Sequence, residues 1–429
     1  MKITFIGHGY VGLVTAAIFA DLGNTVYVIG RTPEKIENLK KGILPIYEPG
    51  LEEIVKRNVD EGRLIFTLDY LPAIPESEVV FIAVGTPPQK TGDAELTTVF
   101  QVAENIAKSM SGHTVVATKS TVPPGTNKRI KQIITENKSD ASEFEIASVP
   151  EFLREGTAIS DTLHPDRVVI GAESKKAREL LSELHKPLGG EIVLTNLETA
   201  ELIKYASNSF LATKISYANA IAKLSEMCGA DGPTVLAGIG LDNRIGSAFL
   251  SAGAGYGGSC FPKDVKALLA ISKNYDYNFA LLDEVEKIND YAKRDIVKKV
   301  KKLVGDLRGK TVGVLGLTFK SNTDDMRDAS SITIINLLKN DGAHIKAYDP
   351  QGMENAKKIM PEIEYVENAY AAAEGADVVI LLTEWNEFNE LDLKKLGAGM
   401  KEPNMVDARN IYSKEELSKV GFKSLGVGR

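Results

Sequence analysis

The sequence predicts an α/β fold with two doubly wound parallel sheets, joined by a long central helix and a helical middle domain. Short apolar runs alternate with amphipathic stretches in the first and last parts of the chain. Between those parts, one helical period runs unbroken from Leu197 to Gly229. Alternating strands and helices are typical of parallel sheets with right-handed crossovers, so the two regions predict two α/β domains.

The first α/β domain is predicted over residues 1–196. Its strands are expected at 3–6, 26–29, 79–84, 114–118, 144–148 and 168–170. Helices are predicted at 11–22 and 33–41, and helix-like segments separate most of the later strands.

The middle domain, residues 197–305, is predicted to be helical throughout. After the long helix, a glycine-rich loop leads to a second helix over 279–304. Apolar and tyrosine stripes on the long helix are sufficient to bury a partner chain, which predicts a homodimer or a higher homo-oligomer. The alternative is a helix that packs only inside its own chain.

The second α/β domain is predicted over residues 306–429. Strands are expected at 312–317, 345–348, 378–382 and 405–406, and helices at 330–340 and 369–374. A weak internal repeat appears when Gly342 is aligned with Gly23, because Asp349 then falls on Gly30. Such a repeat suggests two nucleotide-binding units on either side of the helical middle domain.

Composition limits the classes of function. The chain has 429 residues and a net charge of −7, which argues against nucleic acid as the main ligand. Its two cysteines cannot build a disulfide framework, and no signal peptide is recognised at the start. No apolar run reaches the roughly 18 residues of a membrane span. We therefore expect a cytoplasmic protein with no membrane partner.

A glycine motif lies between the first predicted strand and helix. Gly7, Gly9 and Gly12 form G-x-G-x-x-G, with Tyr10 and Val11 inside it. In this context the glycines permit a tight turn and the close approach of a pyrophosphate to a helix N-terminus, as in Rossmann-like domains. The alternative is a tight turn that binds no ligand.

The end of the second predicted strand departs from the dinucleotide pattern. An acidic residue there normally binds the adenosine ribose, but this chain has Gly30 followed by Arg31. We expect NAD to be used and NADP to be accepted better than in proteins with the acidic residue. Gly30→Asp is expected to restore discrimination. Alternatively, Arg31 stacks on adenine or faces solvent.

Two further groups of residues carry reactive chemistry. Lys204 and Asn208 lie four residues apart on one face of the long helix, where a buried lysine is costly unless an anion needs it. Cys260 lies in a glycine-rich segment, 253–264, in which Lys263 can depress the thiol pKa and Asp264 can orient a water. The alternatives are a solvated lysine at the helix edge and an inert buried thiol.

The motifs together resemble the UDP-glucose/GDP-mannose dehydrogenase family, and within it the UDP-glucose branch. The resemblance rests on GHGYVG at 7–12, VGTPP at 84–88, KSTVPPGT at 119–126, PEFLREG at 150–156, Lys204 with Asn208, RIG at 244–246, GGSCFPKD at 257–264, FKSNTDDMR at 319–327 and DAR at 407–409. It implies an enzyme that oxidises a sugar C6 alcohol twice to a carboxylate, here UDP-glucose to UDP-glucuronate, with two NAD molecules used in turn. The product serves nucleotide-sugar and polysaccharide synthesis in this family.

The resemblance also implies catalytic roles. Cys260 would capture the aldehyde as a thiohemiacetal, which becomes a thioester on loss of hydride. Lys204 and Asn208 would stabilise the oxyanion, and Asp264 with Thr121 would position the water. Glu151 would be the general base of thioester hydrolysis, and its alternative is a surface carboxylate in a loop.

Binding positions follow from the same motifs, and no metal is expected. The cofactor side comprises Gly7, Gly9, Tyr10, Val11, Gly12, Gly30, Arg31, Lys35, Thr86, Ser120, Thr121, Glu155, Lys263 and Arg327. The substrate side comprises Glu151, Phe152, Leu153, Arg154, Glu155, Lys204, Asn208, Phe249, Leu250, Ser251, Gly253, Gly257, Lys320 and Arg409, with Arg244 reaching the substrate of a neighbouring subunit.

Other functions stay open at this point. A GDP-mannose or UDP-N-acetylhexosamine 6-dehydrogenase would share the architecture, although Phe261 is typical of the UDP-glucose branch. A non-catalytic nucleotide-sugar sensor on the same fold is the alternative from another class. The presence of Cys260, Lys204 and Asp264 together argues against the sensor. Oligomer size, pathway context and feedback regulation cannot be read from the sequence.

Overall fold

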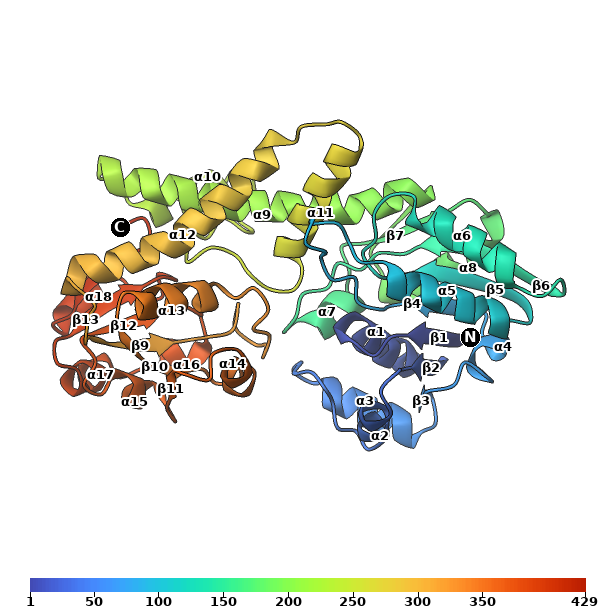
Figure 1. Cartoon of the computed structure of the whole chain (residues 1–429), viewed down its shortest axis with the longest axis horizontal. Coiled ribbons are helices and arrows are strands. Elements are labelled where there is room, and N and C mark those ends of the chain that lie inside the picture. Colours follow the sequence, from blue (N-terminus) through green and yellow to red (C-terminus); the bar gives the residue numbers. More distant parts are fainter. The chain divides into compact units, whose positions relative to one another are not determined.

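The computed structural model describes all 429 residues, which form two compact units. The first unit contains residues 1–207 and 266–271, and the second contains 208–265 and 272–429. Each unit is built on one sheet with helices around it (Figure 1). The predicted α/β fold with two sheets and a long central helix is confirmed.

The first unit has an eight-stranded sheet in the order β3-β2-β1-β4-β5-β6-β7-β8. Its strands are β1 (Lys2–Ile6), β2 (Thr25–Ile29), β3 (Leu64–Thr67), β4 (Val79–Ile82), β5 (Gly112–Thr118), β6 (Ser142–Ser148), β7 (Arg167–Ala172) and β8 (Glu191–Thr195). The pairing is parallel except between β6 and β7, where Ala147 lies opposite Ala172 in an antiparallel register. The first six strands therefore follow the Rossmann order.

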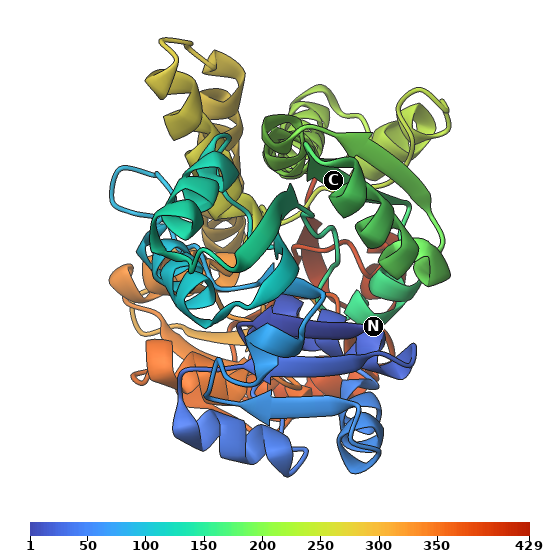
Figure 2. The same cartoon turned by 90° about the vertical axis from the view of Figure 1, so that its right-hand side faces the viewer.

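Helices cover both faces of this sheet, as Figure 2 shows with the first unit toward the viewer. The helices are α1 (Tyr10–Asp21), α2 (Pro33–Lys40), α3 (Leu51–Asp60), α4 (Ala73–Glu76), α5 (Thr97–Ser109), α6 (Thr126–Asn137), α7 (Ala158–Leu163) and α8 (Lys175–His185), followed by a 3₁₀ turn at Lys186–Leu188. Residues of α1, α3, α7 and α8 share one core, and residues of α4, α5 and α6 share the other.

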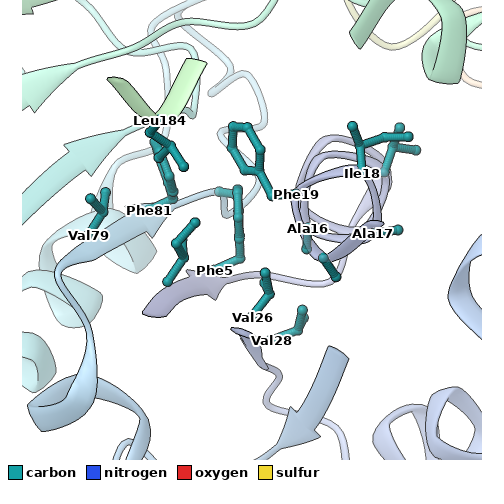
Figure 3. Packing of buried hydrophobic residues seen from close by; sticks show 14 of the residues in the cluster. Phe5, Ala16, Ala17, Ile18, Phe19, Val26, Val28, Val79, Phe81 and Leu184 are labelled. Atoms are coloured by element: carbon teal, nitrogen blue, oxygen red, sulfur yellow. The ribbon is translucent and has the colours of Figure 1, made fainter. Parts of the chain in front are cut away.

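Alternate residues of β1 point into these two cores. Phe5 packs into the first core, where its ring stacks on Phe81 with centroids 4.7 Å apart. Phe19 of α1 lies beside both rings, and Leu184 of α8 packs into the same core (Figure 3). Ile6 faces the second core. This alternation is the period of a β-strand buried on both faces, and it fixes the register of β1 between its neighbours.

The middle of the chain is helical. Helix α9 (Leu197–Cys228) begins in the first unit and ends in the second, and it matches the predicted long helix. It is followed by α10 (Gly232–Gly240), α11 (Phe261–Asn274) and α12 (Ala280–Val304). In the second unit, α12 buries Ile296, Val297 and Val300 in the same core as strand residues Val312 and Val314.

The second unit has a six-stranded, fully parallel sheet in the order β11-β10-β9-β12-β13-β14. Its strands are β9 (Thr311–Leu315), β10 (His344–Tyr348), β11 (Glu364–Tyr365), β12 (Val378–Leu381), β13 (Asn404–Asp407) and β14 (Lys423–Gly426). Its other helices are α13 (Ser330–Asn340), α14 (Met353–Ile359), α15 (Ala369–Ala373), α16 (Asn386–Asn389), α17 (Leu393–Gly399) and α18 (Lys414–Lys419).

The internal repeat is confirmed by these two sheets. The strand order of the second unit equals that of the first six strands of the first unit. Gly7 and Gly316 each follow the first strand of their sheet, and each donates its amide to the last residue of the next strand at 2.9 Å. None of the helices combines the length and the apolar character needed to span a bilayer.

Candidate active site

The glycine motif forms the turn between β1 and α1 in the first unit. Gly7 has φ +119°, and a Cβ there would lie 2.4 Å from the Ala83 carbonyl oxygen. A Cβ at Gly12 would lie 2.2 Å from the Gly7 carbonyl oxygen. Both positions therefore require glycine, one for the turn and one for helix–strand packing. A Cβ at Gly9 would meet nothing within 4 Å, so the motif leaves open space beside that residue.

The N-terminus of α1 is suited to an anion. Gly9 caps this helix without any side-chain bond, and the first turn contains no acidic residue. Unsatisfied backbone amides and the helix dipole favour a phosphate at such an end. The turn and the helix end therefore fit the pyrophosphate of a nicotinamide dinucleotide, which would be held by Gly7, Gly9, Tyr10, Val11 and Gly12.

Three other predicted cofactor residues lie together after strands β4 and β5. The Thr86 hydroxyl donates to the Thr121 carbonyl at 2.9 Å. The Ser120 hydroxyl donates to the Val84 carbonyl at 2.7 Å. Carboxyl ends of parallel strands meet at one edge of the sheet, which is where open α/β sheets bind ligands.

Glu151 and Lys204 form a buried ion pair in the first unit. The Lys204 Nζ lies 3.0 Å from Glu151 Oε1, and the two side chains are 4% and 8% exposed. Glu151 Oε2 also accepts the Leu153 amide at 2.9 Å. The predicted positions of the base and the lysine are thus brought together, and Glu151 is not a surface carboxylate.

An aromatic ring supports this pair. Lys204 Nζ lies 5.2 Å from the centroid of the Phe152 ring, and the Arg167 guanidinium lies 3.8 Å from it. Both distances are within the range of cation–π attraction. Arg167 was not among the predicted site residues, because a single arginine in a strand gives no signal in the sequence.

A second buried lysine, Lys119, was also missed. It follows β5 directly, and its Nζ lies 3.4 Å from the Val149 carbonyl and 5.6 Å from the Phe81 ring centroid. Burial lowers the pKa of Lys119 to about 8, while the Glu151 charge raises it and Lys204 lowers it. The only sequence signal was a lysine at the end of an apolar strand, in the motif KSTVPPGT.

The loop after Glu151 is fixed at both ends. Arg154 pairs with Asp161 at 2.6 Å, and Glu155 is buried. Glu48 accepts the amides of Gly156 at 2.6 Å and Ala158 at 2.7 Å. The Tyr10 hydroxyl bonds to Glu48 and accepts the Gly156 amide, so the glycine motif and this loop are held together. Glu48 was not predicted.

The second unit contains Cys260 and a cluster around Asp264. Cys260 caps the N-terminus of α11, and its Sγ lies 3.6 Å from the Ser259 hydroxyl. Asp264 is fully buried, accepts the Asn208 amide at 2.6 Å and also accepts Lys263 Nζ. The helix N-terminus favours an anionic sulfur, and the carboxylate has one neutral and one cationic donor.

Predicted substrate residues of the second unit gather at the carboxyl ends of its strands. A Cβ at Gly253 would lie 3.3 Å from Arg409 Nη1, and Arg409 Nε donates to the Leu382 carbonyl at 2.7 Å. A Cβ at Gly258 would meet the Phe319 ring at 2.7 Å, and Lys320 Nζ lies 5.7 Å from that ring's centroid. Leu250 is buried and Ser251 is exposed.

The backbone of the loop before α11 is constrained at two further predicted positions, Phe249 and Gly257. Phe249 has φ +63°, which is uncommon for a bulky residue. A Cβ at Gly257 would lie 2.2 Å from the Asp328 carbonyl oxygen, so only glycine fits there.

Two predicted arginines have local partners. Arg244 pairs with Asp242 at 2.6 Å, with 89% of its side chain exposed. Arg327 pairs with Asp325 at 2.6 Å, with 63% exposed. The structure contains no group of three or more His, Cys, Asp or Glu side chains arranged to hold a metal ion.

Comparison with known proteins identifies the family. Three family models match the chain, all from the UDP-glucose/GDP-mannose dehydrogenase family: the NAD binding domain over 1–189, the central domain over 198–291 and the UDP binding domain over 313–414. A UDP-glucose 6-dehydrogenase of Rhizobium meliloti is 49% identical over 100% of both chains. UDP-glucose 6-dehydrogenase TuaD of Bacillus subtilis is 47% identical over 100% of this chain and 93% of its own length.

Solved structures agree with these matches. A UDP-glucose dehydrogenase from the archaeon Pyrobaculum islandicum superposes with a TM-score of 0.93 at 38% identity, covering 99% of this chain and 97% of its own. A UDP-D-ManNAc dehydrogenase from Pyrococcus horikoshii has a TM-score of 0.88 at 27% identity, covering 100% and 99%. The chain therefore belongs to the UDP-glucose/GDP-mannose dehydrogenase family and is an NAD-dependent oxidoreductase.

Proposed function

We propose that this protein oxidises UDP-glucose at C6 twice to give UDP-glucuronate. The observation that carries the proposal is the cluster of Asn208, Lys263 and Asp264 at the N-terminus of α11, next to Cys260. Full-length relatives at 47–49% identity are UDP-glucose 6-dehydrogenases. In the balanced reaction, UDP-glucose, two NAD⁺ and water give UDP-glucuronate, two NADH and three protons.

The cysteine separates the two oxidations. A bound dinucleotide would accept the hydride that leaves C6 in each of the two oxidations. Between the two, Cys260 Sγ attacks the C6 aldehyde carbon, and the carbonyl oxygen takes a proton to give the thiohemiacetal. Loss of hydride and of that proton leaves a thioester on Sγ. The aldehyde is thus never released as a free product.

Polar and charged residues would stabilise the oxyanion and then hydrolyse the thioester. Lys204 and Asn208 would donate to the oxygen that becomes negative at C6. Asp264 and Thr121 would hold the water. Glu151 would take a proton from that water while the water oxygen attacks the thioester carbon, and the Cys260 thiolate would be the leaving group. Lys204 Nζ lies 3.0 Å from buried Glu151 Oε1, so the proposed base and the proposed oxyanion donor lie side by side.

The remaining predicted residues would bind the two ligands. On the cofactor side these are the glycine motif with Gly30, Arg31, Lys35, Thr86, Ser120, Thr121, Glu155, Lys263 and Arg327. On the substrate side these are residues 151–155, Lys204, Asn208, Phe249, Leu250, Ser251, Gly253, Gly257, Lys320 and Arg409. Residues 1–196 would bind NAD, 197–305 would form the oligomer, and 306–429 would bind the UDP-sugar.

The proposed assembly is at least a dimer, formed through α9. Phe210, Tyr217 and Leu224 recur at intervals of seven residues on this helix, with 66%, 52% and 57% of their surface exposed. A heptad of exposed apolar residues is the pattern by which helices of two chains pack. A groove of about 490 Å³ continues the apolar surface beside Leu224, between α9 and α12. Arg244 would reach the partner's substrate.

The substrate assignment has rivals within the family. GDP-mannose and UDP-N-acetylhexosamines are acted on by enzymes of the same fold, and a sensor would bind without reacting. The test is incubation with NAD and a panel of UDP- and GDP-sugars, followed at 340 nm and by product analysis. We expect reduction with UDP-glucose and UDP-glucuronate as the product. Turnover only with another sugar, or binding without reduction, contradicts the proposal.

A further inference from the structure

The carboxyl end of strand β2 lacks the acidic side chain that selects NAD. Gly30 occupies this position, and its amide donates to the Thr67 carbonyl at 3.0 Å. In dinucleotide-binding folds, an acidic residue here binds the ribose hydroxyls, whereas a nearby arginine accommodates a 2′-phosphate. In this chain Arg31 follows directly.

The space for a side chain at Gly30 is already filled. A Cβ there would lie 2.5 Å from Ile36 Cδ1 and 2.8 Å from His8 Nδ1. His8 belongs to the glycine motif, so the motif and the strand end pack against each other. Both side chains must move before an aspartate fits, so the expectation that Gly30→Asp restores discrimination stays a prediction. Removal of cations is the cleaner test.

The cations at this corner have no carboxylate partners. Arg31 and Lys35 are exposed and form no ion pair, whereas Lys40 on the same helix pairs with Glu37 at 2.7 Å. Burial lowers the pKa of His8, and the charges of Lys35 and Arg31 lower it further, so both cations act on this imidazole. The local field at this end of β2 is therefore positive.

The N-terminus of α2 offers hydrogen-bond donors in addition to these two cations. Thr32 caps this helix, and its side chain makes no capping hydrogen bond. Pro33 follows, and Glu34 is the one acidic residue of the first turn. This corner therefore holds two cations and a helix N-terminus against a single carboxylate, a balance of charge that favours an anion.

We infer that Arg31, Thr32 and Lys35 form a subsite for the 2′-phosphate of NADP, so that the chain accepts NADP as well as NAD. The inference rests on the proposed function, in which a dinucleotide binds at the glycine motif. Arginine suits this role because its planar guanidinium makes two parallel hydrogen bonds to a phosphate. Lys35 adds a second charge from one helical turn away.

The test compares 2′,5′-ADP with 5′-ADP, which differ only in the 2′-phosphate, by isothermal titration calorimetry. We expect the wild type to bind 2′,5′-ADP at least tenfold more tightly. Arg31→Gln and Lys35→Gln are each expected to remove most of that difference, by weakening 2′,5′-ADP binding more than 5′-ADP binding. Lys41→Gln, which removes an exposed charge at the other end of α2, is the control and is expected to keep the tenfold preference.

Each other outcome overturns the inference. Equal binding of the two nucleotides by the wild type means that Arg31 does not reach the phosphate, while binding of 5′-ADP still upholds the dinucleotide site. An equal loss in Lys41→Gln means that only the general charge of the surface acts. If neither nucleotide binds, the dinucleotide site itself is wrong. The kcat/KM ratio of NADP to NAD in Arg31→Gln gives a second readout, expected to fall about tenfold.

Discussion

Lys204 Nζ lies 3.0 Å from Glu151 Oε1, and both side chains are almost completely buried. Two charges removed from water need each other, because a lone buried charge is costly. The proposed reaction uses the same two residues, one to stabilise an oxyanion and one to accept a proton. Their pairing therefore joins the stability of the first unit to its chemistry.

The first prediction concerns this pair and the free energy of unfolding. Glu151→Gln and Lys204→Met are each expected to destabilise the protein by about 3–5 kcal/mol, because each removes one charge of a buried ion pair. The double variant is expected to lose less than the sum of the two, because both charges of the pair are then gone. Urea unfolding of all four proteins measures the coupling, and additive losses would show that the pair contributes nothing.

The second prediction concerns Asp264. Asp264→Asn leaves Lys263 without its counter-charge and removes an acceptor from Asn208. We expect kcat to fall by about a hundredfold or more, with little change in KM for UDP-glucose, because positioning of a proton-transfer water is lost. Steady-state kinetics check this. Glu284→Gln, an exposed carboxylate on α12, is the control, and a full-rate Asp264→Asn enzyme would refute the role.

The third prediction concerns acid stability. Burial lowers the pKa of His185 to about 3, so the folded protein excludes a proton that the unfolded chain binds below pH 6.5. Stability therefore falls as pH drops from 6.5 toward 3, by up to about 1.4 kcal/mol per pH unit from this group. His185→Phe is expected to remove that slope between pH 6.5 and 4.5.

The control for this prediction is His164→Gln, because His164 is exposed. Urea midpoints measured across the pH range should keep the wild-type slope in this variant. An unchanged slope in His185→Phe contradicts a buried neutral imidazole. His185→Phe is also expected to lower the free energy of unfolding by the same amount at every pH, since it removes the contact of His185 Nδ1 with the Leu181 carbonyl at 2.8 Å.

The fourth prediction concerns assembly. Leu224→Arg places a charge in the apolar heptad stripe of α9 and is expected to give a monomer with greatly reduced activity. Light scattering coupled to size exclusion measures the mass. Leu71→Arg, at a position 61% exposed in the first unit, is the control and should keep the wild-type mass. A wild-type monomer with full activity would rule out the assembly.

Much of the fold follows from sequence periodicity. The predicted helix over 330–340 equals α13, and the central strands of both sheets match within a few residues. The missed strands β3, β8, β11 and β14 are all at sheet edges. Edge strands are half exposed, as in the alternating burial of β3, so they lack the continuous apolar run that marks a central strand.

Other features depend on tertiary contacts that one sequence does not encode locally. The antiparallel pairing of β6 with β7 depends on the path of the chain between them. Lys119 and Arg167 lie near the Glu151–Lys204 pair only because the fold buries the one and stacks the other. Residues within short motifs, such as Cys260 and Asp264, could be proposed as site residues from the sequence because the motif places the reactive groups beside one another; their roles stay predictions.

The covalent step at Cys260 is tested most directly by intact-mass analysis of Glu151→Gln, mixed with UDP-glucose and NAD and quenched in acid. With the proposed hydrolytic base removed, we expect a thioester adduct of one UDP-sugar acyl group per chain, located by peptide mapping on Cys260. Cys260→Ser combined with Glu151→Gln should carry none. A Glu151→Gln enzyme that reduces NAD with UDP-glucose but never carries mass on Cys260 would contradict the covalent mechanism.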